Sequence, residues 1–174
     1  SSGIRLKGAE YIEVQDSDAF DFTNPFSCEA WVKVTSYGSY GRIFDKSESG
    51  NATNGWHLRV NSNGTANLGV RANELSTAYS ANNSILLNTW HHVVAVFNTN
   101  AVVTLYVDGS VSGTPFDVGS LASNTTTDSL FIGSYKNQSN QFNGSIDEVK
   151  IYDKELSATE VLKNYNNGKS AHSN

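Results

Sequence analysis

The chain has 174 residues, with 17 acidic and 12 basic side chains, a formal net charge of −5 and one cysteine. This length is enough for one domain with a full hydrophobic core. The negative charge argues against a nucleic-acid partner, and no run approaches the roughly 18 apolar residues of a membrane span. Charged residues make up only 17% of a chain rich in asparagine, serine, threonine and glycine, a composition typical of extracellular β-proteins. Methionine is absent even at position 1, so we expect a processed or excised piece of a larger protein.

Almost every segment has the pattern of a short β-strand. In residues 56–60 and 66–72 apolar side chains alternate with polar ones, and Asn63-Gly64 between them is a hairpin signal. Residues 90–97 form a nearly continuous apolar run, typical of a central strand. In chain order, the predicted strands are residues 4–8, 11–14, 27–34, 42–45, 56–60, 66–72, a weak segment at 79–87, 90–97, 102–107, 130–135 and 146–152.

One helix is predicted, over residues 156–165. Ser157 and Glu160 have the spacing of a capping box, and Val161, Leu162 and Tyr165 give the helix an apolar side. Short strands at roughly 8–12-residue spacing, followed by one helix, predict a single all-β domain over residues 1–174, built as a two-sheet antiparallel sandwich.

The last predicted strand contains an unusual acid. Under strict alternation, Asp147 shares a face with Val149 and Ile151, which have the character of core residues. A carboxylate on an apolar face is costly unless it is paired, hydrogen-bonded or bound to a metal. Two explanations stay open: a metal ligand, or an acceptor of backbone hydrogen bonds.

Several motifs follow one another in a characteristic order. They are Tyr11-Ile12-Glu13-Val14, Phe26-Ser27-Cys28-Glu29-Ala30-Trp31-Val32-Lys33, Trp90-His91-His92-Val93-Val94-Ala95-Val96, Leu105-Tyr106-Val107-Asp108-Gly109, Leu130-Phe131-Ile132-Gly133 and Phe142-Asn143-Gly144-Ser145-Ile146-Asp147-Glu148-Val149-Lys150-Ile151-Tyr152. The ordered set resembles the laminin-G-like domains of the concanavalin A-like lectin/glucanase superfamily over nearly the whole chain. The resemblance implies a jelly-roll sandwich with one concave and one convex sheet. It leaves the ligand open, because the family includes carbohydrate-binding modules, adhesion domains and spacers.

The resemblance also implies a metal. In the superfamily, the acid of the last strand often binds a structural calcium at the edge of the sandwich, with oxygens near the first strands. Asp147 matches that position, and Asp16 or Asp18 in the early turn is expected to contribute. Calcium takes six to eight oxygens, many of them from carbonyl groups or water, so one or two carboxylates suffice. Structural Ca²⁺ is therefore the expected cofactor.

The sequence argues against an enzyme. Glycoside hydrolases need two carboxylates on one face, and the Glu-x-Asp-x-Glu strand motif of the superfamily's retaining glucanases is absent. His91 and His92 are adjacent in a predicted strand, so their side chains point to opposite faces and do not form a pair.

Seven residues are predicted to bind a ligand. Sugar sites combine aromatic planes with polar groups that bind the hydroxyls. His57, Arg59 and Arg71 lie on the outward phase of the predicted hairpin, where the alternative is an ordinary solvated face. The full set is Tyr40, Arg42, His57, Arg59, Arg71, Tyr135 and Asn137.

Together these patterns predict a non-catalytic carbohydrate-binding module of a larger secreted or cell-surface protein. The module is expected to hold its parent protein near a glycan or polysaccharide. The alternative is an adhesion or structural spacer domain that binds protein rather than sugar. Exposed aromatic side chains in a groove favour the first function, and a large apolar patch favours the second.

Overall fold

The computed structural model describes residues 4–6, 10–22, 25–48, 54–72, 74–119, 126–136 and 139–173, with the backbone alone at 4–6, 71, 72 and 74–76. The strands are β1 (Ile4–Leu6), β2 (Ile12–Val14), β3 (Phe26–Val34), β4 (Tyr40–Ser47), β5 (Gly55–Asn61), β6 (Ala66–Ala72), β7 (Glu74–Tyr79), β8 (Trp90–Phe97), β9 (Val102–Val107), β10 (Ser110–Val111), β11 (Phe116–Asp117), β12 (Leu130–Ile132) and β13 (Gly144–Tyr152). A 3-10 helix, η1, spans Asp18–Phe20, and an α-helix, α1, spans Ala158–Lys169.

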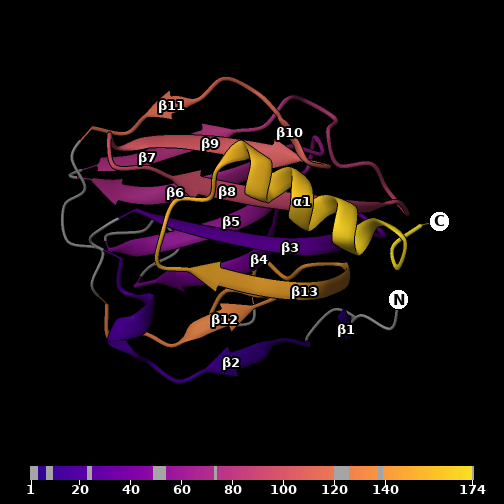
Figure 1. Ribbon diagram of the computed structural model, residues 1–174. Coiled ribbons are helices and arrows are strands. Elements are labelled where there is room, and N and C mark those ends of the chain that lie inside the picture. The colour runs from indigo at the N-terminus through magenta and orange to yellow at the C-terminus, as the bar shows by residue number, and fades with distance from the viewer. Residues whose placement is uncertain are drawn as a thin grey trace.

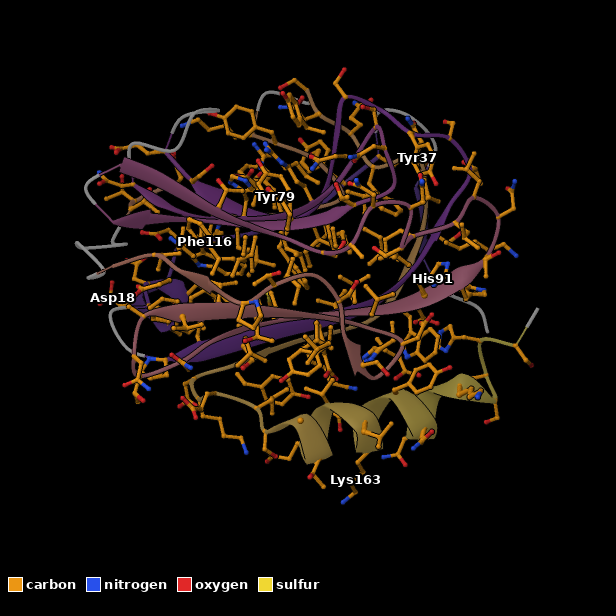
Figure 2. All side chains as sticks on the ribbon, turned by 90° about the horizontal axis from the view of Figure 1, so that it is seen from above. Asp18, Tyr37, Tyr79, His91, Phe116 and Lys163 are labelled. Atoms are coloured by element: carbon orange, nitrogen blue, oxygen red, sulfur yellow. The ribbon has the colours of Figure 1, made fainter. Side chains whose placement is uncertain are left out.

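The strands form two antiparallel sheets that pack face to face. Sheet A has the order β1-β13-β3-β8-β9-β10, with β11 also paired to β9. Sheet B has the order β2-β12-β4-β5-β6-β7. Figure 1 shows α1 crossing in front of the strands of sheet A, and Figure 2 shows it as a third layer on the outer side of the sandwich. The predicted two-sheet jelly-roll with a C-terminal helix is confirmed.

The hydrophobic core lies between the sheets. Alternate residues of β3, from Phe26 to Val34, point into it and are buried. Phe26 stacks on Phe22 with ring centres 4.5 Å apart, and Trp56 of β5 packs against both rings. Cys28 is the small buried side chain expected of a free cysteine, and burial raises the pKa of its thiol.

Helix α1 closes the outer face of sheet A. The predicted capping box is present: the Ser157 side chain accepts from the Glu160 amide at 3.2 Å, and Glu160 accepts from the Ser157 amide at 2.8 Å. Val161 packs into a small apolar cluster on β8 and β9. Gly168 lets the helix approach Trp31, since a Cβ at this glycine would lie 2.3 Å from the indole Nε1. No helix in the described part of the chain is long and apolar enough to cross a membrane.

The weak strand predicted at residues 79–87 is wrong. Strand β7 ends at Tyr79, and the chain then turns. Asn83 and Asn88 have φ angles of 52° and 59°, which a strand does not allow. The segment instead lies across the β5–β6 hairpin, where the Ile85 amide donates to the Gly64 carbonyl.

Candidate functional site

Two rows of polar side chains cross the outer face of sheet B, from β4 to β7. The first row consists of the cross-strand neighbours Arg42, Arg59, Asn67 and Tyr79, and the second of Asp45, His57, Gly69 and Thr77. We call these the polar rows. Core residues alternate with them along the same strands, so the rows face away from the sandwich interior.

A β-bulge in β4 brings an acid into the rows. The pairing of β4 with β5 shifts between Arg42 and Phe44, so one extra residue is accommodated there. Ile43 and Phe44 are both buried in the core, and Arg42 and Asp45 therefore lie on the same outer face. The Arg42 Nε is 3.0 Å from Asp45 Oδ2, within ion-pair distance.

Gly69 makes room for a histidine. A Cβ at Gly69 would lie 2.4 Å from Cε1 and 2.5 Å from Nε2 of His57, so the imidazole lies directly over this glycine. Glycine in a strand interior often marks such a close approach. The His57 side chain thus lies flat on the sheet, 1% exposed.

The polar rows hold most of the unsatisfied polar atoms of the described residues. Eleven buried side-chain nitrogen and oxygen atoms in the described part of the chain lack a hydrogen bond of good geometry, and seven of them belong to five row residues. These are Nε and Nη1 of Arg42, Oδ2 of Asp45, both ring nitrogens of His57, Nε of Arg59 and Oδ1 of Asn67. The Arg42–Asp45 contact is included because its angles do not suit a hydrogen bond. His57 and Asn67 nevertheless lie close enough to interact, as do Arg59 and Tyr79. Buried polar groups are normally paired, so this concentration is unusual and marks the rows as a candidate site.

The rows carry a net positive charge on a negatively charged protein. Burial lowers the pKa of His57 well below its usual value, with Arg42 and Arg59 adding to the effect, so the ring is neutral at pH 7. Burial raises the pKa of Asp45 to about 6, although Arg42 and hydrogen bonds from Ser47 oppose the shift. At neutral pH two guanidinium groups therefore face one carboxylate.

Three tyrosines lie in or beside the polar rows. Tyr40 and Tyr79 are 45% and 51% exposed. The Arg59 Cζ lies 4.2 Å from the centre of the Tyr40 ring, a cation–π contact. Tyr135 is buried and interacts electrostatically with Arg42 and Asp45, while the Lys136 Nζ lies 6.0 Å from its ring centre. The face thus combines exposed aromatic planes with cationic hydrogen-bond donors.

Five of the seven predicted ligand residues meet on this face: Tyr40, Arg42, His57, Arg59 and Tyr135. Arg71 continues β6 beyond the rows, but its side chain lies outside the described residues, as does the whole of Asn137. The predicted set lacks five row residues, namely Asp45, Asn67, Gly69, Thr77 and Tyr79. The interior glycine of β6 was a usable signal for Gly69, whereas the bulge that turns Asp45 to the outer face has no clear sequence signature.

The structure corrects the predicted environment of Asp147. The β13–β3 pairing shifts between Asp147 and Lys150, and Glu148 has a φ angle of 47°. This bulge reverses the phase, so Asp147 lies opposite Trp31 on the outer face of sheet A, away from the core. Its Oδ2 is 3.0 Å from His172 Nε2. Val149 and Ile151 pack against the core as predicted.

Asp16 lies elsewhere. Its Oδ1 accepts a hydrogen bond from Lys46 Nζ at 2.6 Å, and it lines a cavity with Asp18. Asp147 instead contacts His172, which lines a different cavity with Asp108, the partner of His91. Figure 2 shows Asp18 and His91 at opposite ends of the sandwich. Asp16 and Asp147 therefore do not come together, and calcium binding stays a prediction. Within the described ranges, no group of three or more His, Cys, Asp or Glu side chains could hold a metal ion.

The two adjacent histidines point to opposite faces, as predicted. His91 contacts the Asp108 carboxylate at 2.8 Å through Nδ1 and accepts from the Leu86 amide through Nε2. His92 lies on the α1 side of sheet A, 3.6 Å from Glu29. In the polar rows Asp45 is the single carboxylate, so the rows lack the acid pair of a glycoside hydrolase.

A second, smaller cavity lies beneath the C-terminal end of α1. It has a volume of about 180 Å³ and is lined by Trp31, Trp90, Asp108, Tyr165, Lys169, His172 and Ser173. Two of its polar groups are already paired: Asp108 binds His91 and the His92 amide, and His172 binds Asp147. The indole nitrogen of Trp31 is the one lining atom among the eleven that lack a hydrogen bond, against seven in the polar rows. The polar rows are therefore the stronger candidate site.

Solved structures with the same fold include glycan-binding domains. The CBM40 domain of a Ruminococcus gnavus IT-sialidase matches 95% of this chain and 97% of its own length, at 16% identity and a TM-score of 0.78. The same domain bound to α2,3-sialyllactose gives a TM-score of 0.79. The binding domain of Paraclostridial Mosquitocidal Protein 1 matches at 18% identity and a TM-score of 0.73. That match covers 92% of this chain but only 42% of the toxin chain. At these identities the similarity concerns the fold alone.

A family model covers most of the chain, whereas no curated protein matches it. The model is Laminin_G_3, described as Concanavalin A-like lectin/glucanases superfamily, and it matches residues 6–162. The motifs identified in the sequence, the two antiparallel sheets and this match agree, and the chain belongs to the laminin G-like family of the concanavalin A-like lectin/glucanase superfamily.

Proposed function

We propose that the domain is a non-catalytic carbohydrate-binding module that holds a carboxylate-bearing glycan on the outer face of sheet B. Its role is to keep a larger secreted or cell-surface protein close to that glycan. The observation that carries the proposal is the cluster of the exposed rings of Tyr40 and Tyr79 with the guanidinium of Arg59, next to row atoms that lack good hydrogen bonds.

The aromatic layer suits a sugar ring. The apolar face of a pyranose packs on an aromatic plane, while groups at the ring edge form hydrogen bonds. Tyr40 and Tyr79 belong to strands on either side of the β5–β6 hairpin, with Arg59 between them. A bound sugar on Tyr40 or Tyr79 is therefore within the same patch as the guanidinium of Arg59.

The charge of the rows favours an acidic sugar. Arg59 supplies a partly exposed guanidinium group, which can bind a carboxylate through paired N–H donors, while the buried guanidinium of Arg42 lies beside Asp45 and adds to the positive charge of the rows. Asp45 offsets only one of the two positive charges, and His57 contributes none at pH 7. The sialyllactose complex of the CBM40 domain, which has the same fold, supports a sialylated glycan as the first ligand to test. A uronic acid polymer presents the same carboxylate chemistry.

Binding to 3′-sialyllactose, lactose and polygalacturonate, measured by isothermal titration calorimetry, tests the proposal. We expect at least one acidic glycan to bind at least tenfold more tightly than lactose. Arg59→Ala should weaken that binding tenfold or more, because a hydrogen bond to a charged group contributes about 1.5–3 kcal/mol. Tyr40→Ala should weaken it through lost stacking.

Lys163→Ala is the matched control. Lys163 lies on the exposed side of α1 (Figure 2), so the variant loses a positive charge remote from sheet B and should bind like the wild type. Tighter binding of lactose than of either acidic glycan would refute the preference for acidic sugars, while the proposal that the domain binds a glycan would stand. Failure of every glycan on a folded sample would refute the glycan function and favour a protein-binding adhesion domain.

A further inference from the structure

A buried lysine occupies the sandwich end where Asp16 lies. Lys46 is the penultimate residue of β4, and its side chain is fully buried. Its Nζ donates to Asp16 Oδ1 at 2.6 Å, to the Thr126 carbonyl at 2.9 Å and to the Asp128 carbonyl at 2.8 Å. Asp21 Oδ1 lies 3.2 Å away. Two carboxylates and two carbonyl oxygens thus surround one ammonium group.

These four oxygens come from two distant stretches of the chain. Asp16 and Asp21 flank η1, and Thr126 and Asp128 precede β12. Lys46 therefore ties both stretches to β4 at a single charged centre. An isolated buried charge is costly, but here each of the three ammonium protons has an acceptor and the carboxylates balance the charge.

The arrangement suits an ammonium group and not a divalent ion. Calcium requires six to eight oxygens at about 2.3–2.6 Å, and magnesium requires an octahedron of six. Here four oxygens lie at 2.6–3.2 Å, and Nζ already occupies their centre. A divalent ion at this point would meet the lysine charge directly. The residues present therefore do not fit the structural calcium that the family resemblance implies.

We propose that the Lys46 ammonium acts as the structural cation at the Asp16 end of the sandwich, so that this end folds without calcium and, if the proposed function holds, the glycan also binds without it. The lysine charge is covalently attached to the chain and cannot dissociate as a metal ion can. The contacts that it makes between β4, η1 and the segment before β12 therefore do not depend on the calcium concentration of the solution.

The adjoining cavity makes the proposal testable by gain of function. It has a volume of about 480 Å³ and is lined by Asp16, Asp18, Asp21, Glu48, Thr126 and Thr127. Truncation of Lys46 to alanine opens the ammonium position toward this cavity. An ion could then reach Asp16, Asp21 and the two carbonyls, and water from the cavity could complete its coordination.

The experiment measures Tm with EDTA and with millimolar CaCl₂ for the wild type, Lys46→Ala and Lys46→Met. We expect the wild-type Tm to be the same in both conditions. Lys46→Ala should melt lower in EDTA and rise by about 5–10 °C in calcium, if calcium exceeds its dissociation constant about a hundredfold. Lys46→Met should be destabilised in both conditions, since it removes the charge but still fills the space.

A wild-type Tm that falls in EDTA would overturn the proposal, and this measurement stands even if neither variant folds. An alanine variant with no greater calcium response than the methionine variant would show that the oxygens do not form a cation position. An Asp16→Asn/Lys46→Ala protein should lose the rise of Tm in calcium that Lys46→Ala alone shows. This loss would identify Asp16 as a ligand of the bound calcium.

Discussion

Glu29 is expected to hold α1 on sheet A, and Glu29→Gln tests this directly. The carboxylate is fully buried on the outer face of β3. It accepts hydrogen bonds from Lys150 Nζ at 2.9 Å, from the Tyr152 hydroxyl at 3.0 Å and from Asn164 Nδ2 of α1 at 2.9 Å. Burial alone would raise the pKa of Glu29, but His92, Lys150 and Asn164 outweigh it and lower the pKa from 4.5 to about 2.

The magnitude follows from this pKa. A carboxylate with a lowered folded-state pKa stabilises the protein above its unfolded pKa, and the contribution is lost as pH falls through 4.5 toward 2. A shift from 4.5 to about 2 corresponds to about 3 kcal/mol, of which about 2 kcal/mol is lost by pH 3. Solvent screening weakens the contribution of Lys150, whose side chain is 43% exposed, so about 3 kcal/mol is an upper bound.

Urea unfolding at pH 7 and pH 3 measures the effect. At pH 7, Glu29→Gln should lower the free energy of unfolding by up to about 3 kcal/mol, since glutamine cannot supply the charge that Lys150 and Asn164 bind. Its loss of stability between pH 7 and pH 3 should be up to about 2 kcal/mol smaller than that of the wild type. Glu13→Gln, at an exposed carboxylate on β2, is the control. Equal losses in the wild type and Glu29→Gln would refute the reasoning.

Three further changes test other parts of the structure. Gly69→Ala should displace the His57 ring, lower stability by about 1–3 kcal/mol and weaken glycan binding in calorimetry, and a His57→Ala/Gly69→Ala protein should recover part of the stability because the clash is gone. Asp45 has a folded-state pKa raised to about 6, so its protonation should raise the free energy of unfolding by about 1 kcal/mol between pH 7 and pH 5, as measured by urea unfolding. An Asp45→Asn protein whose free energy of unfolding rises equally between these pH values would contradict this. Asp147→Asn weakens the bond to His172, so its Tm should fall by about 2–4 °C, equally in EDTA and in calcium, whereas a fall seen only in calcium would support a metal at Asp147.

Alternation and turn signals were enough to predict the fold. The apolar phase of β5 and β6, the Asn63-Gly64 turn and the capping box at Ser157 each depend on interactions between residues close in sequence. The outward phase of β5 also placed His57 and Arg59 on one face. Such local patterns predict the structure well because one face of each strand must be apolar to pack against the core.

Bulges limited the prediction of side-chain orientation. One extra residue at Ile43 and one near Glu148 each reverse the phase of the strand that follows. Strict alternation therefore assigned Asp147 to the core and separated Asp45 from Arg42. A bulge is stabilised by packing across the whole sheet, and neither strand sequence contains a glycine at the extra position to indicate it.

Strand β4 links the proposed binding face to the internal cation. It carries Arg42 and Asp45 on the outer face and ends at the Lys46 centre. The link continues through Asp128, whose carbonyl binds Lys46 and whose carboxylate binds Lys136 at 2.8 Å. The Lys136 Nζ also donates to the Glu48 carbonyl and lies 6.0 Å from the Tyr135 ring centre.

The position of Tyr135 beside the polar rows therefore depends in part on a charge at the sandwich end. A mobile metal at that end would make the binding face sensitive to calcium, whereas a lysine keeps it in place at any calcium concentration. On this argument Lys46→Ala should weaken glycan binding in EDTA and recover it in calcium, although no Lys46 atom lies in the polar rows.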